Sequence, residues 1–490
     1  MRKKLFLVSG LLAATLFTAC NNEEITMPQG DNEASQELVL ALSDGSLNMA
    51  RSSNAFARVA AAAGIGDAGA INAFGRPLYS SMASQYVQNI KVYFVDAQNK
   101  IARVVNVDKD YWKQSLAYNN GRKLTISLKG TDKLKDGEYT VYACAYSEDS
   151  GYKFAPTVEA KDTEWKDFYA TVSQGNDPSE VFAGQATVTA KDTKDEVSLK
   201  SGNGNALVTL YRQVAGISGY FKNIPANVDG DVPTHLRLVA SGKNTQVLFG
   251  ELKTNAGDAD KVNVNHVMNG AEASTNDKTA EYVGGKAKGH VVYEIDLNKW
   301  FTGGFDKADT NKDGFVNADD ITSENPWVNP NAKVNNHVQG LVKGSVWGGK
   351  FVIPFAQVSG VPTLQLQLVQ KAADGKVSLL KYWNIKVDAT YPTASAVELP
   401  TGAIAAVTGD ESQEVYNIYR NHMYSIGKKN FDNGDSKPTT PVDPDTENPE
   451  KPIDPEQPDG NNQPGDLSKG QDLTIHVNSN WEAVHNMEID

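Results

Sequence analysis

The sequence predicts a mainly β fold with two β-sandwich domains in tandem. Short runs in which apolar and polar residues alternate recur along the chain, and long amphipathic helices are scarce. Two further strand-like runs stand alone, one near each end of the chain. An isolated strand must pair with a sheet elsewhere, so we expect sandwiches of short strands and two terminal strands that add to them.

Length and charge bound the function classes. The chain has 490 residues, of which 40% are hydrophobic and 22% charged, and a formal net charge of −13. This length predicts roughly two or three domains. No Lys/Arg cluster stands out beyond the extreme N-terminus. Nucleic acid is therefore not expected as a partner, because phosphate binding needs a concentrated basic face.

The N-terminus has the pattern of an export signal. Positive residues 2–4 precede an apolar run at 5–17, which is too short to span a membrane as a mature helix. Small residues then precede Cys20, as in a bacterial lipobox. We expect residues 1–19 to be a signal peptide and Cys20 to carry the lipid, a palmitate-type modification. Simple secretion with cleavage near Ala19 is the alternative.

The second of the two cysteines, Cys144, lies in the strand-like run YTVYACAY. If Cys20 is acylated, no intramolecular disulfide can form. We therefore expect Cys144 to be a small buried residue and not a nucleophile.

The first strand is predicted in ELVLALSDGS. Leu38, Leu40 and Leu42 fall on one face and smaller apolar residues on the other, which is typical of a strand buried on both faces. A loose stretch rich in Ala, Gly, Ser and Asn follows, and it contains Arg51 and Arg58. Such a stretch is accessible to proteases. The alternative is that both are ordinary surface arginines.

Strand-like runs then recur through the rest of the folded region. The first half contains VQNIKVYFVD, KLTISLKG, GEYTVYACAY, VFAGQATVTA and EVSLKSGNGNALVTLYRQVAGISGYFKNIP. A turn signal at residues 202–204 places the domain boundary there, which gives an N-terminal domain at 52–203 and a C-terminal domain at 204–431. The second half contains THLRLVAS, HVVYEIDL, GKFVIPFA and TLQLQLVQKAADGKVSLLKYWNIKV, the last with a hairpin turn at Asp374-Gly375.

The stretch DTNKDGFVNADD, residues 309–320, has the spacing of a calcium loop. Gly314 stands at the sharp turn, and Asp closes the loop where an EF-hand has Glu. The expected ligands of one calcium ion are Asp309, Asn311, Asp313, the carbonyl of Phe315, Asn317 and Asp320. We expect the ion to stiffen an insertion in the second domain. The alternative is a loop of Asx turns that stays empty.

The C-terminal region changes composition. Residues 432–470 are dominated by Pro and acidic residues and cannot bury a core, so we expect an extended spacer. Residues 471–490 follow with Leu473, Ile475 and Val477 on one face, and then Trp481. This strand has no local partner in the sequence, so we expect it to be donated to another chain. The alternative is that it completes a sheet of its own chain.

Three stretches carry a resemblance to a known family. They are IYRNHMYSI at 418–426, YRQVAGISGYF at 211–221 and LTIHVNSNW at 473–481. With the lipobox, the first strand and the arginine-containing stretch, the chain resembles the fimbrillins of Bacteroidales, the FimA-type subunits of type V pili, over its whole length. The resemblance implies two transthyretin-like, Greek-key sandwiches.

The resemblance also implies a route of assembly. The precursor would reach the outer membrane as a lipoprotein, and an Arg-specific surface protease would remove residues 20–51, the lipidated propeptide with the first strand. Cleavage would follow Arg51, or alternatively Arg58. The emptied groove would accept the C-terminal strand of another copy, giving a fimbria on the cell surface that serves adhesion and biofilm formation. The partners would be other copies, anchor and tip subunits, and the protease.

No catalytic pattern supports an enzyme. The sequence has no His-Glu-x-x-His, no phosphate loop ending in Gly-Lys-Ser/Thr and no Gly-x-Ser-x-Gly. Two alternatives to a polymerising pilin remain. One is a calcium-dependent surface lipoprotein that binds glycans, with Trp300, Trp327 and Trp347 exposed. The other is a pilus anchor subunit that is never cut and keeps its lipid.

Overall fold

The computed structural model describes most of the region between the first strand and the acidic spacer, and a short C-terminal part. The chain divides into two compact units, Met1–Ala34 and Ser35–Asp490, and the description below concerns the second. The described residues are 34–42, 87, 89–108, 111, 116–118, 121–146, 150–157, 159–202, 204–249, 267–330, 341–387, 395–398, 404–407, 413–427, 464–469 and 472–478.

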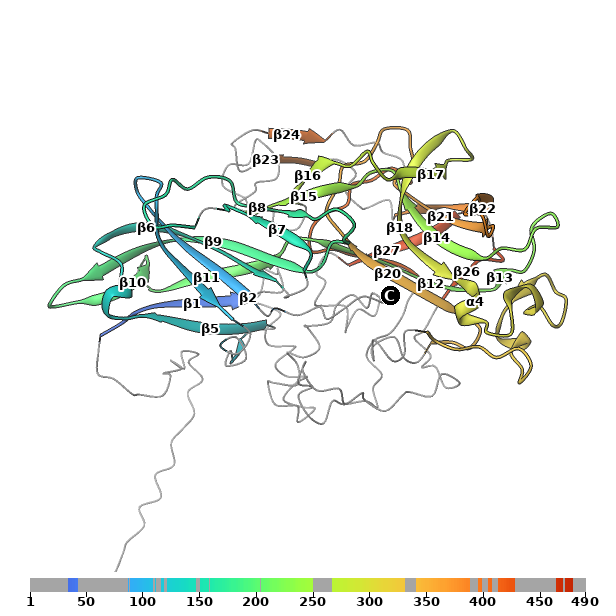
Figure 1. Cartoon of the computed structure of the whole chain (residues 1–490), viewed down its shortest axis with the longest axis horizontal. Coiled ribbons are helices and arrows are strands. Elements are labelled where there is room, and N and C mark those ends of the chain that lie inside the picture. Colours follow the sequence, from blue (N-terminus) through green and yellow to red (C-terminus); the bar gives the residue numbers. More distant parts are fainter. Residues whose placement is uncertain are drawn as a thin grey trace, which may run out of the picture. The chain divides into compact units, whose positions relative to one another are not determined.

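A nine-stranded sheet contains most strands of the first half, drawn from blue to green in Figure 1. Its strands, in the order of the sheet, are β3 (Ile101–Val107), β2 (Asn89–Asp96), β6 (Gly137–Tyr146), β9 (Val181–Asp192), β10 (Val197–Ser201), β11 (Gly204–Arg212), β1 (Gln36–Leu42), β5 (Gly121–Leu128) and β4 (Leu116–Tyr118).

A ten-stranded sheet contains most strands of the second half. Its strands, in order, are β17 (Lys278–Tyr282), β18 (Ala287–Asp296), β14 (His235–Ala240), β21 (Leu364–Lys371), β22 (Val377–Lys386), β27 (Asp472–Asn478), β25 (Met423–Ile426), β12 (Ala215–Lys222) and β20 (Val346–Val352). The tenth strand, β26 (Gly465–Asp466), pairs with β12 outside this order.

Three smaller sheets and a few short helices complete the described structure. The sheets are β16 (Gly270–Ala273), β15 (Asn244–Leu248), β8 (Tyr169–Val172) and β7 (Tyr152–Ala155); β13 (Ile224–Pro225) and β19 (Phe315–Val316); and β23 (Ser395–Glu398) and β24 (Ile404–Val407). The helices are α4 (Leu297–Trp300) and the 3-10 turns η1 (Gly130–Asp132), η2 (Phe305–Lys307) and η3 (Ala318–Asp320). In the described residues no helix is long and apolar enough to cross a membrane.

The prediction of a mainly β fold is confirmed. The alternating pattern works as expected in β2, where Ile90, Val92 and Phe94 are buried on one face. Tyr93 and Val95 are buried on the other face, so β2 lies between two cores. The predicted hairpin at residues 374–375 joins β21 to β22, and Gly375 there has a φ of +84°. Cys144 is buried, as predicted, and burial raises the pKa of its thiol to about 12.

The predicted domain boundary does not coincide with the division between the sheets. The turn at Gly202 joins β10 to β11 within one sheet, and the chain enters the ten-stranded sheet only after Val214. The two halves also share structure. β8 of the first half pairs with β15 of the second, and one core cluster contains Tyr93 from the first half and Phe351 from the second. A turn signal marks a change of direction and does not tell whether the next strand stays in the same sheet.

A buried ion pair lies where the chain passes between the two large sheets. Arg212, which is 1% exposed, donates from Nε to Glu180 Oε1 at 2.6 Å and from Nη1 to Asn421 Oδ1 at 3.0 Å. Burial raises the pKa of Glu180 to about 7, although Arg212 acts to lower it. The guanidinium also lies over the ring of Phe182. The hydrogen bond between Arg212 and Asn421 ties the two resemblance stretches, 211–221 and 418–426, to each other.

A second buried polar group continues the junction. Gln213 Oε1 accepts hydrogen bonds from Arg420 Nη1 at 3.0 Å and from Asn269 Nδ2 at 2.9 Å. The backbone follows the same path, since Asn421 N donates to Val214 O at 2.8 Å. Burial lowers the pKa of Arg420 to about 10. These buried groups need their partners, because an unpaired buried charge is strongly destabilising.

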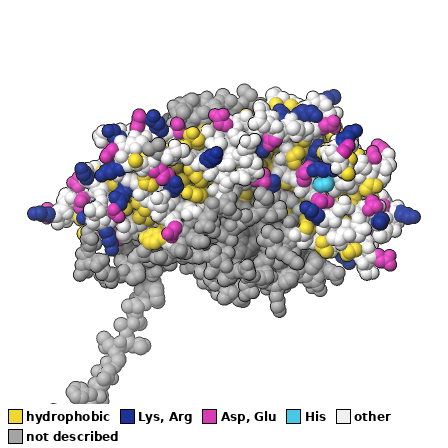
Figure 2. Space-filling model, viewed as in Figure 1, with side chains coloured by type: hydrophobic (Ala, Val, Ile, Leu, Met, Phe, Trp, Pro, Cys, Tyr) yellow, Lys and Arg dark blue, Asp and Glu magenta, His cyan; other side chains and the backbone are white. Residues whose placement is uncertain are grey.

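Charged side chains are spread over the molecular surface. On the face shown in Figure 2, cationic and anionic side chains of the described residues are interspersed with apolar ones. The net charge of −13 is therefore not gathered into one acidic patch on that face.

Replacing Arg212 tests the junction. Arg212→Met should lower the free energy of unfolding by about 3–5 kcal/mol, because it leaves the Glu180 carboxyl buried without its cation. Urea unfolding measures this loss. The matched control is Lys200→Met, which removes an exposed pair with Glu196 and should leave the free energy of unfolding unchanged within error. Equal stabilities for the two variants would contradict a structural role for the junction.

Candidate functional site

The candidate site is the groove that holds the N-terminal strand β1. This strand lies between β11, to which it is parallel, and β5, to which it is antiparallel. Figure 1 shows β1 in blue beside these two strands. Five residues of β1 pair with β11 and all seven pair with β5. Without β1, the hydrogen-bonding groups on facing edges of β11 and β5 would have no strand between them.

The leucines of β1 fill the core, as the sequence predicted. Leu38 and Leu40 are both 0% exposed. Leu38 stands opposite Ile126 and Ala206, and Leu40 stands opposite Leu124 and Val208. All of these belong to one hydrophobic cluster, and Ala41 is buried as well. The backbone of Leu42 continues the pairing, while its side chain lies outside the described residues.

Gln36 anchors the start of β1 and was missed in the sequence. Its side chain is 0% exposed, and its Nε2 donates to the carbonyls of Leu134 and Lys191, each at 2.9 Å. The amide of Leu134 donates to Gln36 Oε1 at 2.7 Å. We call these three backbone groups the glutamine socket. Gln36 shares the face of Leu38 and Leu40, so a polar residue on an apolar face at period two was the available signal.

The structure does not describe three residues that the sequence predicted to be functional. Cys20, Arg51 and Arg58 lie outside the described residues, as does the stretch that links β1 to Val87. Lipidation and cleavage are therefore predictions from the sequence.

The C-terminal strand has partners within its own chain, as in the alternative that the sequence left open. β27 lies between β22, to which it is parallel, and β25, to which it is antiparallel. Leu473 and Ile475 are buried in the core of the ten-stranded sheet. The backbone of Val477 stands opposite Tyr424, and Trp481 lies outside the described residues. The reason is a gap between β22 and β25 that no neighbouring segment fills, so a strand distant in sequence completes it.

The predicted calcium loop folds as a series of Asx turns. Gly314 has a φ of +91°, the left-handed conformation that the turn requires. Asp309 Oδ2 accepts from Gly314 N at 3.0 Å, and Asp313 Oδ1 accepts from Phe315 N at 2.9 Å. Asn311 and Asn317 likewise accept from amides two residues further on, at 2.9 Å each.

The closing residue of the loop, Asp320, is buried. Its Oδ1 accepts from Thr310 N at 2.8 Å, and its Oδ2 accepts from Asn317 N at 3.0 Å. The predicted ligands are all oxygen donors, which is the chemistry that calcium prefers. Their oxygens are nevertheless satisfied by amides of the loop. Within the described ranges no three His, Cys, Asp or Glu side chains converge as a metal site would require. The loop thus has only oxygen donors at the predicted ligand positions and a shape that it keeps through its own hydrogen bonds.

The tryptophans expected on a glycan-binding surface are not exposed. Trp300 and Trp347 are 2% and 1% exposed and belong to the core of the ten-stranded sheet. Trp327 packs against the same core, and its Nε1 donates to the carbonyl of Ser345 at 2.7 Å. The expectation was wrong for Trp347 because it lies on β20, on a face that packs into the core. The sequence did not reveal which face of this strand would be buried.

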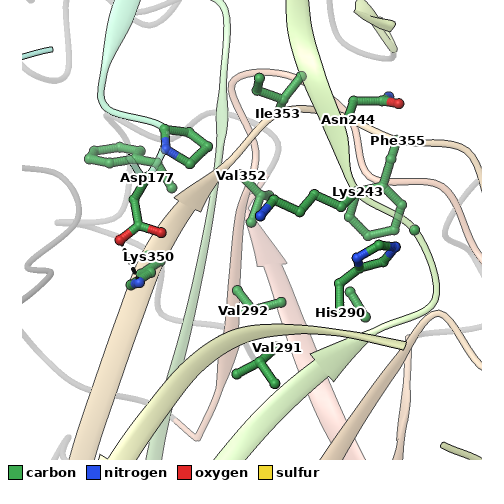
Figure 3. Close-up of a pocket in the computed structure, with 14 residues that line it drawn as sticks. Asp177, Lys243, Asn244, His290, Val291, Val292, Lys350, Val352, Ile353 and Phe355 are labelled. Atoms are coloured by element: carbon green, nitrogen blue, oxygen red, sulfur yellow. Dashed lines mark hydrogen bonds and ion pairs between the residues drawn. The ribbon is translucent and has the colours of Figure 1, made fainter. Parts of the chain in front are cut away.

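A pocket near His290 is lined by apolar residues and by a few polar ones, and Figure 3 shows two of the polar residues, Asp177 and Lys350, paired with each other. Lys350 Nζ donates to Asp177 at 2.6 Å, and His290 Nδ1 lies 2.8 Å from Asp277 Oδ1. Burial raises the pKa of Asp277, but hydrogen bonds from Lys243, Ser274 and His290 outweigh it and hold the pKa at about 2. Burial lowers the pKa of His290, although Asp277 acts to raise it. These polar groups therefore have partners within the chain.

Comparison with known proteins gives one family match. The model of the fimbrillin-A associated anchor proteins Mfa1 and Mfa2 matches residues 73–284, less than half of the chain. No curated protein matches the sequence.

Similar solved structures are distant. A fimbrial assembly protein from Parabacteroides distasonis is 11% identical, with a TM-score of 0.28, over 81% of this chain and 92% of its own. The tip fimbrial protein Mfa3 from Porphyromonas gingivalis is 10% identical, with a TM-score of 0.29, over 80% and 94%. The fimbrial anchor protein Mfa2 from the same organism is 12% identical, with a TM-score of 0.24, over 44% and 76%.

The family match falls on the segment that contains β2 to β11, which includes both walls of the β1 groove. It describes fimbrial proteins and not enzymes. The match agrees with the resemblance found in the sequence: residues 73–284 are similar to a family of fimbrial proteins.

Proposed function

We propose that the chain is a structural, non-catalytic subunit of a fimbria, in which strand β1 is removed and a strand of another copy takes its place. Its precursor would be an outer membrane lipoprotein held through Cys20. An Arg-specific surface protease would cut after Arg51, or after Arg58. The observation that carries the proposal is the position of β1, a buried strand whose only covalent link to the rest of the fold is the segment with both arginines.

Loss of β1 would leave an unstable surface. Burial of Leu38 and Leu40 stabilises the fold by roughly 1.5–3 kcal/mol for each side chain. Their removal would expose the apolar residues of β5 and β11 together with two unpaired strand edges. A strand from another copy would again bury the apolar residues and pair the two strand edges. Donation from one copy to the next is heterologous, so it would generate a filament and not a closed pair.

The proposed donor is the C-terminal strand at residues 471–490. The predicted spacer at 432–470 would allow it to reach another copy once β26, which lies within that spacer and pairs with β12, is released. The mature form would lie on the cell surface in fimbriae, with anchor and tip subunits as further partners and with adhesion and biofilm formation as its role. Signal peptide 1–19 and propeptide 20–51 would be absent from it.

A second candidate is an anchor subunit that is never cut. Two observations favour it: the matching family is one of anchor proteins, and β27 lies in its own sheet. In an anchor, the lipid would stay on Cys20 and β1 would stay in its groove. The glycan-binding alternative loses its aromatic surface, because Trp300 and Trp347 are buried.

The cleavage step is tested by removing both arginines. Arg51→Ala with Arg58→Ala should abolish the ladder of detergent-resistant multimers that the protease-treated native chain gives on an unboiled denaturing gel, because β1 stays tethered. Arg76→Ala is the matched control, since Arg76 lies in the same stretch but precedes Pro77, where trypsin-like proteases cut poorly.

The two candidates give different results in this assay. A ladder from the double variant would remove cleavage from the proposal. A native chain that stays lipidated, keeps β1 and forms no ladder under the same treatment would be the anchor.

We also propose that the loop at residues 309–320 binds one calcium ion. The support is its oxygen-only donor set and its Gly314 turn. The melting temperature of the native chain should be higher in 1 mM calcium than in chelator by several degrees, as expected for an ion that binds the folded state. Asp313→Asn should lose this difference, and Asp306→Asn, an exposed acid outside the predicted ligand set, should keep it. Identical melting of the native chain in both conditions would mean an empty loop of Asx turns.

A further inference from the structure

We infer that residues 471–477 of a second copy enter the β1 groove in the register of residues 36–42, with Gln471 in the glutamine socket that Gln36 fills. This inference rests on the proposed strand exchange and names its register and the residue that sets it. Three observations support it: a shared sequence pattern, a shared kind of gap and the geometry of the socket.

The two terminal strands share one pattern. Residues 36–42 read QELVLAL and residues 471–477 read QDLTIHV. In both, a glutamine is followed by an acid and then by three large apolar residues at period two. These apolar residues are Leu38, Leu40 and Leu42 in one run and Leu473, Ile475 and Val477 in the other. The match covers the polar first position as well as the apolar face, which period-two alternation alone does not require.

The two strands also fill gaps of the same kind. β1 has a parallel neighbour, β11, on one side and an antiparallel neighbour, β5, on the other. β27 has a parallel neighbour, β22, and an antiparallel neighbour, β25. In each gap the first two apolar residues of the pattern are buried: Leu38 and Leu40 in one core, Leu473 and Ile475 in the other. The two gaps thus share strand directions and an apolar face, although β1 pairs with both neighbours along residues 38–42 and β27 pairs with β22 at 472–474 and with β25 at 475–478.

The glutamine socket requires both a donor and an acceptor on one side chain. It presents two carbonyls, of Leu134 and Lys191, and one amide, of Leu134. A carboxamide satisfies all three, whereas a carboxylate or an ammonium group satisfies only part. Gln36 reaches them from a fully buried position, where an unmet partner is costly.

The socket fixes the register that the apolar residues leave open. A strand that slips by one residue turns its apolar face outward and is rejected. A slip by two residues keeps the face inward, so the leucine pattern does not exclude it. Such a slip would place Leu473 where Gln36 lies and leave the socket's amide and carbonyls without partners. Only the register with Gln471 in the socket satisfies both the apolar and the polar positions.

The match is poorest at Ala41. This residue is 2% exposed, and His476 would take its place. The other outward positions, Glu37 and Val39, would be replaced by Asp472 and Thr474, which are similar or smaller in size. A second transplanted strand with alanine in place of this histidine therefore distinguishes two causes of instability. One is a poor fit of the histidine side chain, and the other is a wrong register of the whole strand.

The experiment transplants the strand within one uncut chain. In the full chain, residues 36–42 are replaced by QDLTIHV, and Gln36→Ala is made in both the native and the transplanted chain. Thermal unfolding should show that the transplanted chain melts within a few degrees of the native chain. Gln36→Ala should lower the melting temperature by a similar amount in both, because the same socket is emptied.

Two outcomes overturn the inference. One is a transplanted chain that fails to fold even when the transplanted histidine, which stands at position 41, is changed to alanine. The other is a Gln36→Ala effect that is present in the native chain and absent from the transplanted one. Neither readout depends on proteolysis or on polymerisation.

A second assay tests the exchange itself. Gln471→Ala in the otherwise native chain should slow formation of the multimer ladder by about tenfold, the factor that corresponds to ~1.4 kcal/mol. Gln463→Ala, in the acidic spacer, is the control and should leave the rate unchanged. Equal rates for all three chains would overturn the role of Gln471. A native chain that forms no ladder would reject the proposed function, and the transplant would then decide the inference alone.

Discussion

The fold depends on two gaps that must be filled by strands from the ends of the chain. A strand buried inside a sheet has to pair its backbone groups on both sides, since unpaired buried amides and carbonyls are costly. The nine-stranded sheet meets this requirement between β11 and β5 only through β1. The ten-stranded sheet meets it between β22 and β25 only through β27. The segments that close both sheets thus come from the two ends of the described strands, β1 first and β27 last.

The junction around Arg212 holds one wall of each gap. β11 ends at Arg212, and β25 begins two residues after Asn421, so the hydrogen bond between these side chains ties the two walls together. Gln213, Arg420 and Asn269 extend the same buried cluster. None of these contacts involves β1 or β27. These contacts can therefore hold β11 and β25 in position when β1 or β27 is absent. A groove that is to accept a strand from another copy requires this.

The sequence predicted the strands well and their partners poorly. Alternation placed β1, β2, β6 and β27 because a half-buried or fully buried strand imposes a period of two on its own residues. It did not predict the glutamine socket, because Leu134 and Lys191 are 98 and 155 residues from Gln36 and the sequence shows no link between them. The same limit explains Trp300 and Trp347, whose burial depends on which face of the chain meets a core built from distant strands. It also explains β27, whose gap is created by β22 and β25.

The number of terminal strands decides whether both gaps of one chain can be filled. In the uncut chain both gaps are filled by its own terminal strands, β1 and β27. A chain that has lost β1 keeps both gaps and only one strand to fill them. Sequence similarity between the two strands then matters, because in the proposed exchange β27 would leave its own ten-stranded sheet for the nine-stranded sheet of a neighbour. The choice between a closed, anchored chain and an assembling one would therefore be made in the arginine-containing segment after β1, and the strands themselves would need no change.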